Sequence, residues 1–256
     1  MADLRFFLQN IDPQTGIVNF PRDIAHQIAH VLRLQPGDQV TVLDGQGSTY
    51  QVQLGALDQN PLSATIVHFG EDTTILPLHM MLFFPLTKRE KVEWVLQKGT
   101  EVGVSAFHPF VSDRSLVQDM ALPVKKMGRW DSIIREAAEQ SGRTFLPVLH
   151  QPQHLSHIVS SCRDQYGLDA VLVAAVGEGA GNLGPHLDLL LKRHVNPALG
   201  LFIGAEGGFS DQEIALFRKE NFSLISMGET VLRMETAAII FPALVLHQFS
   251  DRHRSE

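Results

Sequence analysis

The sequence predicts an α/β protein with two modules, a small mostly-β module at the N-terminus and a larger α/β domain with a mostly parallel sheet. Turn residues divide the first 70 or so residues into short runs that are typical of short strands. Further along, amphipathic helical patterns alternate with near-continuous apolar runs, the pattern of strands covered on both faces. We place the domain boundary so that the modules are residues 1–72 and 73–256.

The N-terminal module is expected to contain one short helix and one hairpin. Apolar residues recur at helical spacing after Pro21, and Pro36-Gly37 ends that pattern. Alternating stretches then flank Asp44-Gly45, a turn signal that predicts a β-hairpin.

The larger domain alternates strands and helices. Its helical patterns carry apolar residues on one face and polar residues on the other. We expect helices within 88–103 and 124–142, and strands within 79–85, 104–112, 169–177, 199–204 and 222–228.

Composition excludes several classes of protein. The longest apolar run, residues 236–246, is too short to span a bilayer, and the N-terminus lacks the long apolar stretch of a signal peptide. The single cysteine, Cys162, permits no internal disulfide, which fits a reducing cytoplasm. His26 and His30 have the spacing of two metal ligands, but nothing nearby completes a set, so we expect no metal site.

Charge is spread unevenly along the chain. The net charge is −7, but residues 81–143 hold 10 basic and 8 acidic residues, against 3 basic and 8 acidic in residues 1–72. The middle stretch is therefore the plausible surface for a polyanion such as RNA. A pair of solvated helix surfaces would explain the same pattern.

The stretch LGLFIGAEGGFSDQEIALF, residues 199–217, joins a strand to a helix through a glycine turn. The helix begins with a capping box, Ser210 as N-cap and Glu213 three residues later. Ligands bind at such carboxyl ends of parallel strands. Glu206 would repel a phosphate, so the turn favours a neutral or cationic ligand. An ordinary tight turn is the alternative.

A second loop, within residues 225–241, also leaves an apolar run through a glycine, and it carries Arg233 and Glu235 before an apolar helix. We expect the two loops to converge at one edge of the sheet. In the alternative, Arg233 and Glu235 pair with each other or cap the helix. Neither a phosphate-binding Walker loop, a nucleophile elbow nor a dinucleotide fingerprint occurs.

Five motifs in the same order resemble the small-subunit (16S) ribosomal RNA uracil-N3 methyltransferases of the RsmE type, a family of the SPOUT class. The resemblance covers nearly the whole chain. The motifs are HVLRLQPGD (30–38), KREKVEWVLQKGTEVGVSAFHPFVSDRS (88–115), RWDSIIREAAEQSGR (129–143), IGAEGGFSDQE (203–213) and MGETVLRMETAA (227–238).

The resemblance implies a PUA-like RNA-binding β-barrel in residues 1–72 and a SPOUT methyltransferase domain with a trefoil knot in residues 73–256. It implies S-adenosylmethionine as cofactor, and 16S rRNA or the small ribosomal subunit as substrate. The residues it places around the cofactor are Ile203, Gly204, Glu206, Gly207, Gly208, Met227, Gly228, Leu232 and Thr236.

Catalytic and RNA-binding roles follow from the same resemblance and from charge. Arg233 is expected to position the uracil or stabilise its developing anion, and Glu235 is either a general base or a helix cap. Contacts to RNA phosphates are expected from Arg33, Lys88, Lys91, Lys98, Arg114 and Arg143.

The last helix, residues 235–249, is apolar around most of its circumference. Together with the resemblance, this predicts a homodimer with a shared active site, although burial within its own domain would also explain it.

Two positions depart from the family pattern. Ala205 replaces the proline usual in the glycine turn, and Pro242 would kink the last helix. Two other functions stay open: a SPOUT methyltransferase that modifies another RNA position, and a non-catalytic RNA-binding ribosome assembly factor.

Overall fold

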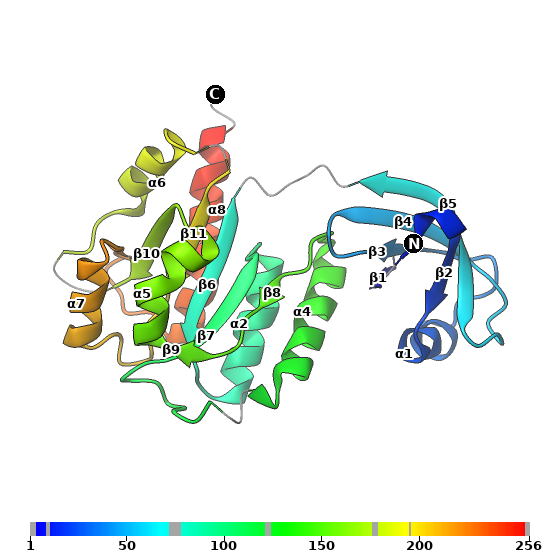
Figure 1. Cartoon of the computed structure of the whole chain (residues 1–256), viewed down its shortest axis with the longest axis horizontal. Helices are drawn as coiled ribbons and strands as arrows, with labels where there is room; N and C mark the ends of the chain where they lie inside the picture. Colours follow the sequence, from blue (N-terminus) through cyan, green and yellow to red (C-terminus); the bar gives the residue numbers. More distant parts are fainter. Residues whose placement is uncertain are drawn as a thin grey trace. The chain divides into compact units, whose positions relative to one another are not determined.

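The computed structural model describes residues 4–8, 11–71, 78–120, 124–175, 179–194 and 196–253 (Figure 1). The chain forms two compact units, one of Met1–Ile75 with Ala138–Leu146 and the other of Leu76–Ala137 with Pro147–Glu256. The domain boundary expected between residues 72 and 73 lies outside the described residues. The segment Ala138–Leu146 joins the first unit, although it follows much of the second unit in sequence.

The first unit is a curled sheet of five strands in the order β1-β3-β4-β5-β2. β1 runs parallel to β3, and the other neighbours are antiparallel. The expected hairpin is present as β3 and β4, and the expected helix as α1 with the π-helical turn η2. The bounds are β1 Arg5–Phe7, η1 Pro13–Thr15, β2 Ile17–Phe20, α1 Arg22–His26, η2 Gln27–Val31, β3 Gln39–Leu43, β4 Ser48–Leu54 and β5 Leu62–Glu71.

One face of this sheet forms the main core of the first unit, where Phe6, Val42 and Val52 pack with Phe20 and Ile28. Side chains of alternate residues point to the opposite face. There Phe7 and Leu43 pack with Ala138 and Leu146, which explains why the segment Ala138–Leu146 belongs to this unit.

The second unit contains a seven-stranded sheet in the order β12-β10-β11-β6-β7-β8, with β9 also paired to β7. Its neighbouring strands are parallel, as the apolar runs predicted. The bounds are β6 His79–Pro85, β7 Ala106–Val111, β8 Val148–Leu149, β9 Gln153–His154, β10 Ala170–Ala174, β11 Ala198–Phe202 and β12 Ser223–Ile225.

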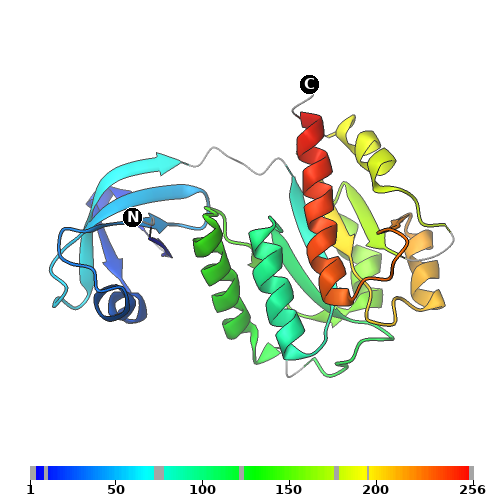
Figure 2. The ribbon, with the colours of Figure 1, turned by 180° about the vertical axis from the view of Figure 1, so that it is seen from behind.

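Helices cover both faces of this sheet, with α5 and α7 in front of it in Figure 1 and α2 and α8 in front of it in Figure 2. The last helix continues through Pro242 without interruption. No described helix is both long and apolar enough to cross a membrane. The bounds are α2 Arg89–Glu101, α4 Met127–Ser141, α5 Leu155–Tyr166, α6 Leu183–Leu191, α7 Asp211–Lys219 and α8 Met234–His253.

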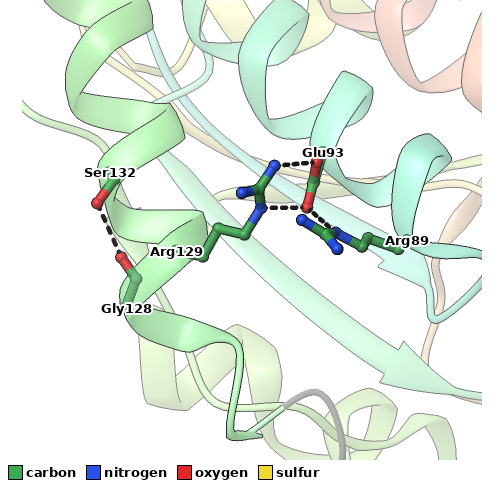
Figure 3. A network of polar contacts seen from close by, with 5 residues as sticks. All are labelled: Arg89, Glu93, Gly128, Arg129 and Ser132. Atoms are coloured by element: carbon green, nitrogen blue, oxygen red, sulfur yellow. Dashed lines mark hydrogen bonds and ion pairs between the residues drawn. The ribbon is translucent and has the colours of Figure 1, made fainter.

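An ion-pair cluster connects α2 with the beginning of α4 (Figure 3). The carboxylate of Glu93 lies 2.6 Å from Nε of Arg89 and 2.6 Å from Nε of Arg129. These guanidinium groups, Arg129 foremost, lower the pKa of Glu93 to about 2. The cluster therefore remains fully charged at neutral pH.

Candidate active site

Two loops meet at the carboxyl edge of the parallel sheet. The glycine turn connects β11 to α7, and residues 226–233 connect β12 to α8. β10 lies between β11 and β12, so the three strands bring both loops to one place. There they line a cavity of about 420 Å³, and the expected convergence is present.

Most residues that the family resemblance implied for the cofactor line this cavity, with the exception of Thr236. Those that line it are Ile203, Gly204, Glu206, Gly207, Gly208, Met227, Gly228 and Leu232. The two residues expected to be catalytic, Arg233 and Glu235, are not among its lining residues.

Sequence reasoning missed part of the cavity wall. Ala174 and Ala175 line it from the end of β10, and Thr230, Val231 and Ala237 line it from the second loop and α8. The two alanines carry no chemical signal. Their place at the carboxyl end of a central parallel strand was the one feature that could have indicated them.

The glycine turn is closed by one hydrogen bond, in which the N–H of Gly208 donates to the carbonyl of Ala205 at 2.8 Å. Gly208 has φ +71°, whereas Gly204 and Gly207 are not in the left-handed region. At Gly204 a Cβ would lie 3.1 Å from the backbone of Gly208, so the absence of a side chain at Gly204 lets the two ends of the turn come close together. The turn forms with Ala205 in place of proline.

Side chains from neighbouring segments hold the turn in place. The guanidinium of Arg114 donates to the carbonyl of Gly207, and the hydroxyl of Ser210 donates to Asp113 at 2.6 Å. The predicted capping box is confirmed, because the N–H of Glu213 donates to Ser210 Oγ at 3.2 Å and the N–H of Ser210 donates to Glu213 at 2.8 Å.

Lys91 of α2 connects the two loops electrostatically. Its ammonium pairs with Glu206 in the glycine turn and lies 3.2 Å from Oε2 of Glu235 in the first turn of α8. That oxygen is buried and has no hydrogen-bond partner in the described part of the chain, so Lys91 is its counter-charge. Because Lys91 sits beside two carboxylates, its own pKa is raised, with Glu206 as the main cause.

Glu206 lies in a cationic environment. Lys91 lowers its pKa most, and the charges of Lys88 and Arg233 act in the same direction. The carboxylate is therefore ionised at neutral pH. Arg233 itself is exposed and directly precedes α8, so its charge is close enough to act on the turn although it does not line the cavity.

The other residues predicted to bind RNA are scattered. Lys88 is exposed at the start of α2, and Lys98 forms an ion pair with Glu101 at 2.8 Å. Arg33 is exposed on the first unit. Arg143, also in the first unit, is partly buried, and burial lowers its pKa to about 10. The structure thus places Arg114 and Lys91 at the glycine turn and leaves Lys98, Arg33 and Arg143 outside the cavity wall.

Two buried titratable groups are also absent from the wall of this cavity. Burial raises the pKa of the Cys162 thiol to about 12, so it is a poor nucleophile. His108 is fully buried, accepts or donates one hydrogen bond with Tyr166 at 2.9 Å, and has its pKa lowered by burial to about 4. Both side chains belong to the packing of the second unit.

Comparisons with known proteins agree with this geometry. A family model described as an RNA methyltransferase domain matches residues 74–246, and one described as an RNA methyltransferase PUA domain matches residues 20–67. The chain is similar to proteins named ribosomal RNA small subunit methyltransferase E. The Synechocystis protein is 33% identical, with 84% of this chain and 68% of that protein covered. The Bacillus subtilis protein is 28% identical, with 87% of each covered.

Solved structures are similar over almost the whole chain. A ribosomal RNA small subunit methyltransferase E from Neisseria gonorrhoeae, bound to S-adenosylmethionine, is 28% identical with a TM-score of 0.82, covering 96% of this chain and 98% of that one. A putative methyltransferase from Legionella pneumophila in complex with the same cofactor is 29% identical, also with a TM-score of 0.82 and the same coverage.

Proposed function

We propose that this chain, which belongs to the RNA methyltransferase family, transfers a methyl group from S-adenosylmethionine to N3 of one uridine in 16S rRNA. The family model spans most of the second unit, and relatives named ribosomal RNA small subunit methyltransferase E match over both units. The observation that carries the proposal is the cavity formed by the glycine turn and the loop before α8.

The residues of this cavity fit the cofactor. S-adenosylmethionine supplies an electrophilic methyl group on a positively charged sulfonium and carries no phosphate. Apolar side chains such as Ile203 and Leu232 suit its adenine ring, and the glycine backbone is open to hydrogen bonds. An ionised Glu206 tolerates a cation at the same place. Thr236, which lies outside the lining, is the weakest member of the proposed cofactor set.

In the proposed reaction the N3–methyl bond of uridine forms as the sulfur–methyl bond breaks, which leaves S-adenosylhomocysteine, and the proton of N3 passes to solvent water. Arg233, exposed beside the turn, is suited to orient the uracil and to stabilise the negative charge that develops on its carbonyl oxygens. Glu235 is buried against Lys91, which favours an anchoring role at the start of α8 over that of a general base.

The target base must leave its stack to reach such a cavity. We propose that Lys88 and Arg114, both exposed, hold RNA phosphates near the turn, with Lys98, Arg33 and Arg143 as further contacts. We also propose that the first unit is a PUA-like barrel that binds RNA and that the protein acts in the cytoplasm.

A homodimer and a trefoil knot belong to the same proposal. Ile240 and Leu244 are 41% and 38% exposed on consecutive turns of α8, an apolar stripe that a second copy would cover. The knot is proposed from the resemblance to the SPOUT class alone. A crystallographic trace of this loop would test the knot.

The decisive experiment incubates the purified protein with methyl-labelled S-adenosylmethionine and small ribosomal subunits that lack the modification. We expect label at N3 of a single uridine, located by mass spectrometry of RNA fragments. Label at a ribose or at another base would favour a different methyltransferase specificity, and binding without label would favour an assembly factor.

Light scattering tests the dimer. We expect twice the chain mass of 28.4 kDa for the parent and an inactive monomer for Leu244→Glu. A fully active parent of monomer mass would exclude a shared active site.

A further inference from the structure

The first unit carries a cavity of its own, of about 440 Å³, that no motif and no similarity assigns to a ligand. It lies on the side of the curled sheet opposite the core around Phe6 and Val42, because its residues alternate with those of the core along β1, β3 and β4. On β5 a register shift places His68 opposite Gln51, on the same face. Apart from Leu43 and a glycine, its lining residues are polar or charged.

Four of these polar residues form one row across four adjacent strands. Arg5 of β1 is paired with Thr41 of β3, Thr41 with Gln51 of β4, and Gln51 with His68 of β5. Neighbouring strands lie about 5 Å apart, so the row extends over roughly 15 Å, which is sufficient for one nucleotide. The row presents a guanidinium, a hydroxyl, an amide and an imidazole in sequence.

Parts of the cavity are rigidly built. Thr41 and Thr144 line the cavity and are only 8% and 7% exposed, so they belong to its buried floor. The guanidinium of Arg5 donates to the carbonyl of Gly142 at 2.8 Å. Gly142 has φ +74°, and a Cβ there would lie 2.8 Å from Nη1 of Arg5, so a side chain at this position would displace that guanidinium.

The charge of the N-terminal region indicates whether this cavity binds the phosphate backbone or a base of the RNA. Residues 1–72 hold 3 basic and 8 acidic residues, so general attraction for the phosphate backbone is weak. Amide and hydroxyl groups instead match the donors and acceptors on the edge of a base. Unpaired nucleotides expose these edges, and proteins recognise RNA sequence mostly there.

We propose that this cavity binds one unpaired nucleotide of the RNA substrate through its base and sugar, with Gln51 and Thr41 hydrogen-bonded to the base edge and Arg5 and His68 beside the sugar. The carboxylate of Glu71 also lines the cavity and disfavours a phosphate there. The proposal rests on the proposed function, in which the chain methylates ribosomal RNA. It gives the first unit a specific task, the selection of a nucleotide distinct from the one that is methylated.

The test compares Gln51→Leu with Gln53→Leu in the full-length protein. Gln53 lies two residues further along β4, on the same face and also exposed, but does not line the cavity. We expect Gln51→Leu to weaken binding to unmethylated small subunits about tenfold, as loss of a base-edge contact does. Because an uncharged group is removed, the dependence of the dissociation constant on salt should not change. Gln53→Leu should bind within about twofold of the parent.

Thr41→Val, which removes a buried hydroxyl with little change of shape, is the second variant and should also weaken RNA binding. The affinity for S-adenosylmethionine, measured by calorimetry, should stay the same in all three variants. Parent-like RNA affinity in both Gln51→Leu and Thr41→Val, or an equal loss in Gln53→Leu, would overturn the proposal. A parent protein that neither binds nor methylates the subunit would refute the proposed function itself, which is a distinguishable result.

Discussion

The cavities of the two units have nearly the same volume, about 420 Å³ and about 440 Å³, but they are built in different ways. In the second unit the wall comes from two loops in which backbone and apolar side chains predominate, with Gly204 and Gly208 at the closest approach. In the first unit the wall is a row of polar side chains on the face of a sheet, from Arg5 to His68.

This difference determines what a sequence can reveal. A site built from backbone needs glycines at fixed spacing, and such a cluster is visible in the sequence. A site built from side chains across a sheet draws one residue from each of several strands, so its members are separated along the chain and form no motif. The glycine turn was therefore found from the sequence, and the polar row was not.

The largest effect should come from Gly208→Val in the second unit. Valine is strained at φ +71°, and its side chain would occupy space at the wall of the cavity. We expect S-adenosylmethionine affinity to fall by about two orders of magnitude or more in calorimetry, equivalent to roughly 3 kcal/mol.

The matched control is Gly167→Val, at the end of α5, where φ is +60° and a Cβ meets nothing within 4 Å. It imposes the same backbone strain away from the cavity wall and should lower the melting temperature without lowering cofactor affinity. If folded Gly208→Val protein bound the cofactor as the parent does, the glycine turn would not be the cofactor site.

Next in size is Lys91→Met, which removes the counter-charge of Glu235 and the partner of Glu206. An unpaired buried carboxylate costs roughly 1–3 kcal/mol, so we expect a lower melting temperature and about tenfold weaker cofactor binding. Lys91→Arg keeps the positive charge, so its melting temperature and its cofactor affinity should lie between those of Lys91→Met and the parent.

Lys98→Met is the control on the same helix, since Lys98 pairs with Glu101 outside the cavity wall. The resemblance and the charge pattern predicted that both lysines contact RNA phosphates. The salt dependence of RNA binding distinguishes a lysine that contacts phosphate from one that only pairs with carboxylates of the protein. A Lys91→Met protein with parent-like cofactor affinity, and a salt slope for RNA binding reduced by about one, would show that Lys91 is a phosphate contact.

A smaller effect is expected from Gly142→Ala in the first unit. The new Cβ would lie 2.8 Å from Nη1 of Arg5 and displace that guanidinium from its hydrogen bond. We expect roughly threefold weaker RNA binding, within the range of one lost hydrogen bond, and unchanged cofactor binding. Gly167→Ala has the same backbone cost without a displaced side chain, so an equal loss of RNA affinity there would contradict the role of Arg5.

The smallest effect belongs to Glu93, which lines neither cavity and should alter stability alone. Its pKa is lowered from 4.5 to about 2 in the folded protein, so its ion pairs stabilise the fold above pH 4.5 and are lost as the pH falls toward 2. The partners Arg89 and Arg129 are half exposed, and solvent screening limits the contribution to about 1 kcal/mol or less.

Thermal unfolding of Glu93→Gln should therefore show a small loss of stability at pH 7 that disappears toward pH 2. Glu90→Gln, an exposed position of the same helix, is the control. A change in the affinity for S-adenosylmethionine or for RNA in Glu93→Gln would contradict the prediction that Glu93 alters stability alone. It would mean that the contact between α2 and α4 shapes a binding site.

Local sequence determined much of this protein. Apolar periodicity indicated the main strands of the parallel sheet and the helices α2 and α4, and the capping box of Ser210 and Glu213 marked the start of α7. The glycine turn was also visible in the sequence, but only the structure shows that Gly208, and neither Gly204 nor Gly207, has a positive φ. The helix cap and the apolar periodicity depend on a few neighbouring residues, because they are short-range properties. Pro242 lies inside α8, which runs from Met234 to His253 without interruption, and the kink expected at this proline stays a prediction.

Tertiary structure alone decided which distant groups meet. Lys91 and Glu206 are 115 positions apart, and their pairing depends on how α2 packs beside the sheet edge. The segment Ala138–Leu146 joined the first unit because its apolar residues cover Phe7 and Leu43, a match of surfaces that periodicity does not encode. Strand register likewise aligned Arg5, Thr41, Gln51 and His68. The sequence determines which chemical groups the side chains carry, but the distances between those groups follow from packing and hydrogen-bond register over the whole fold.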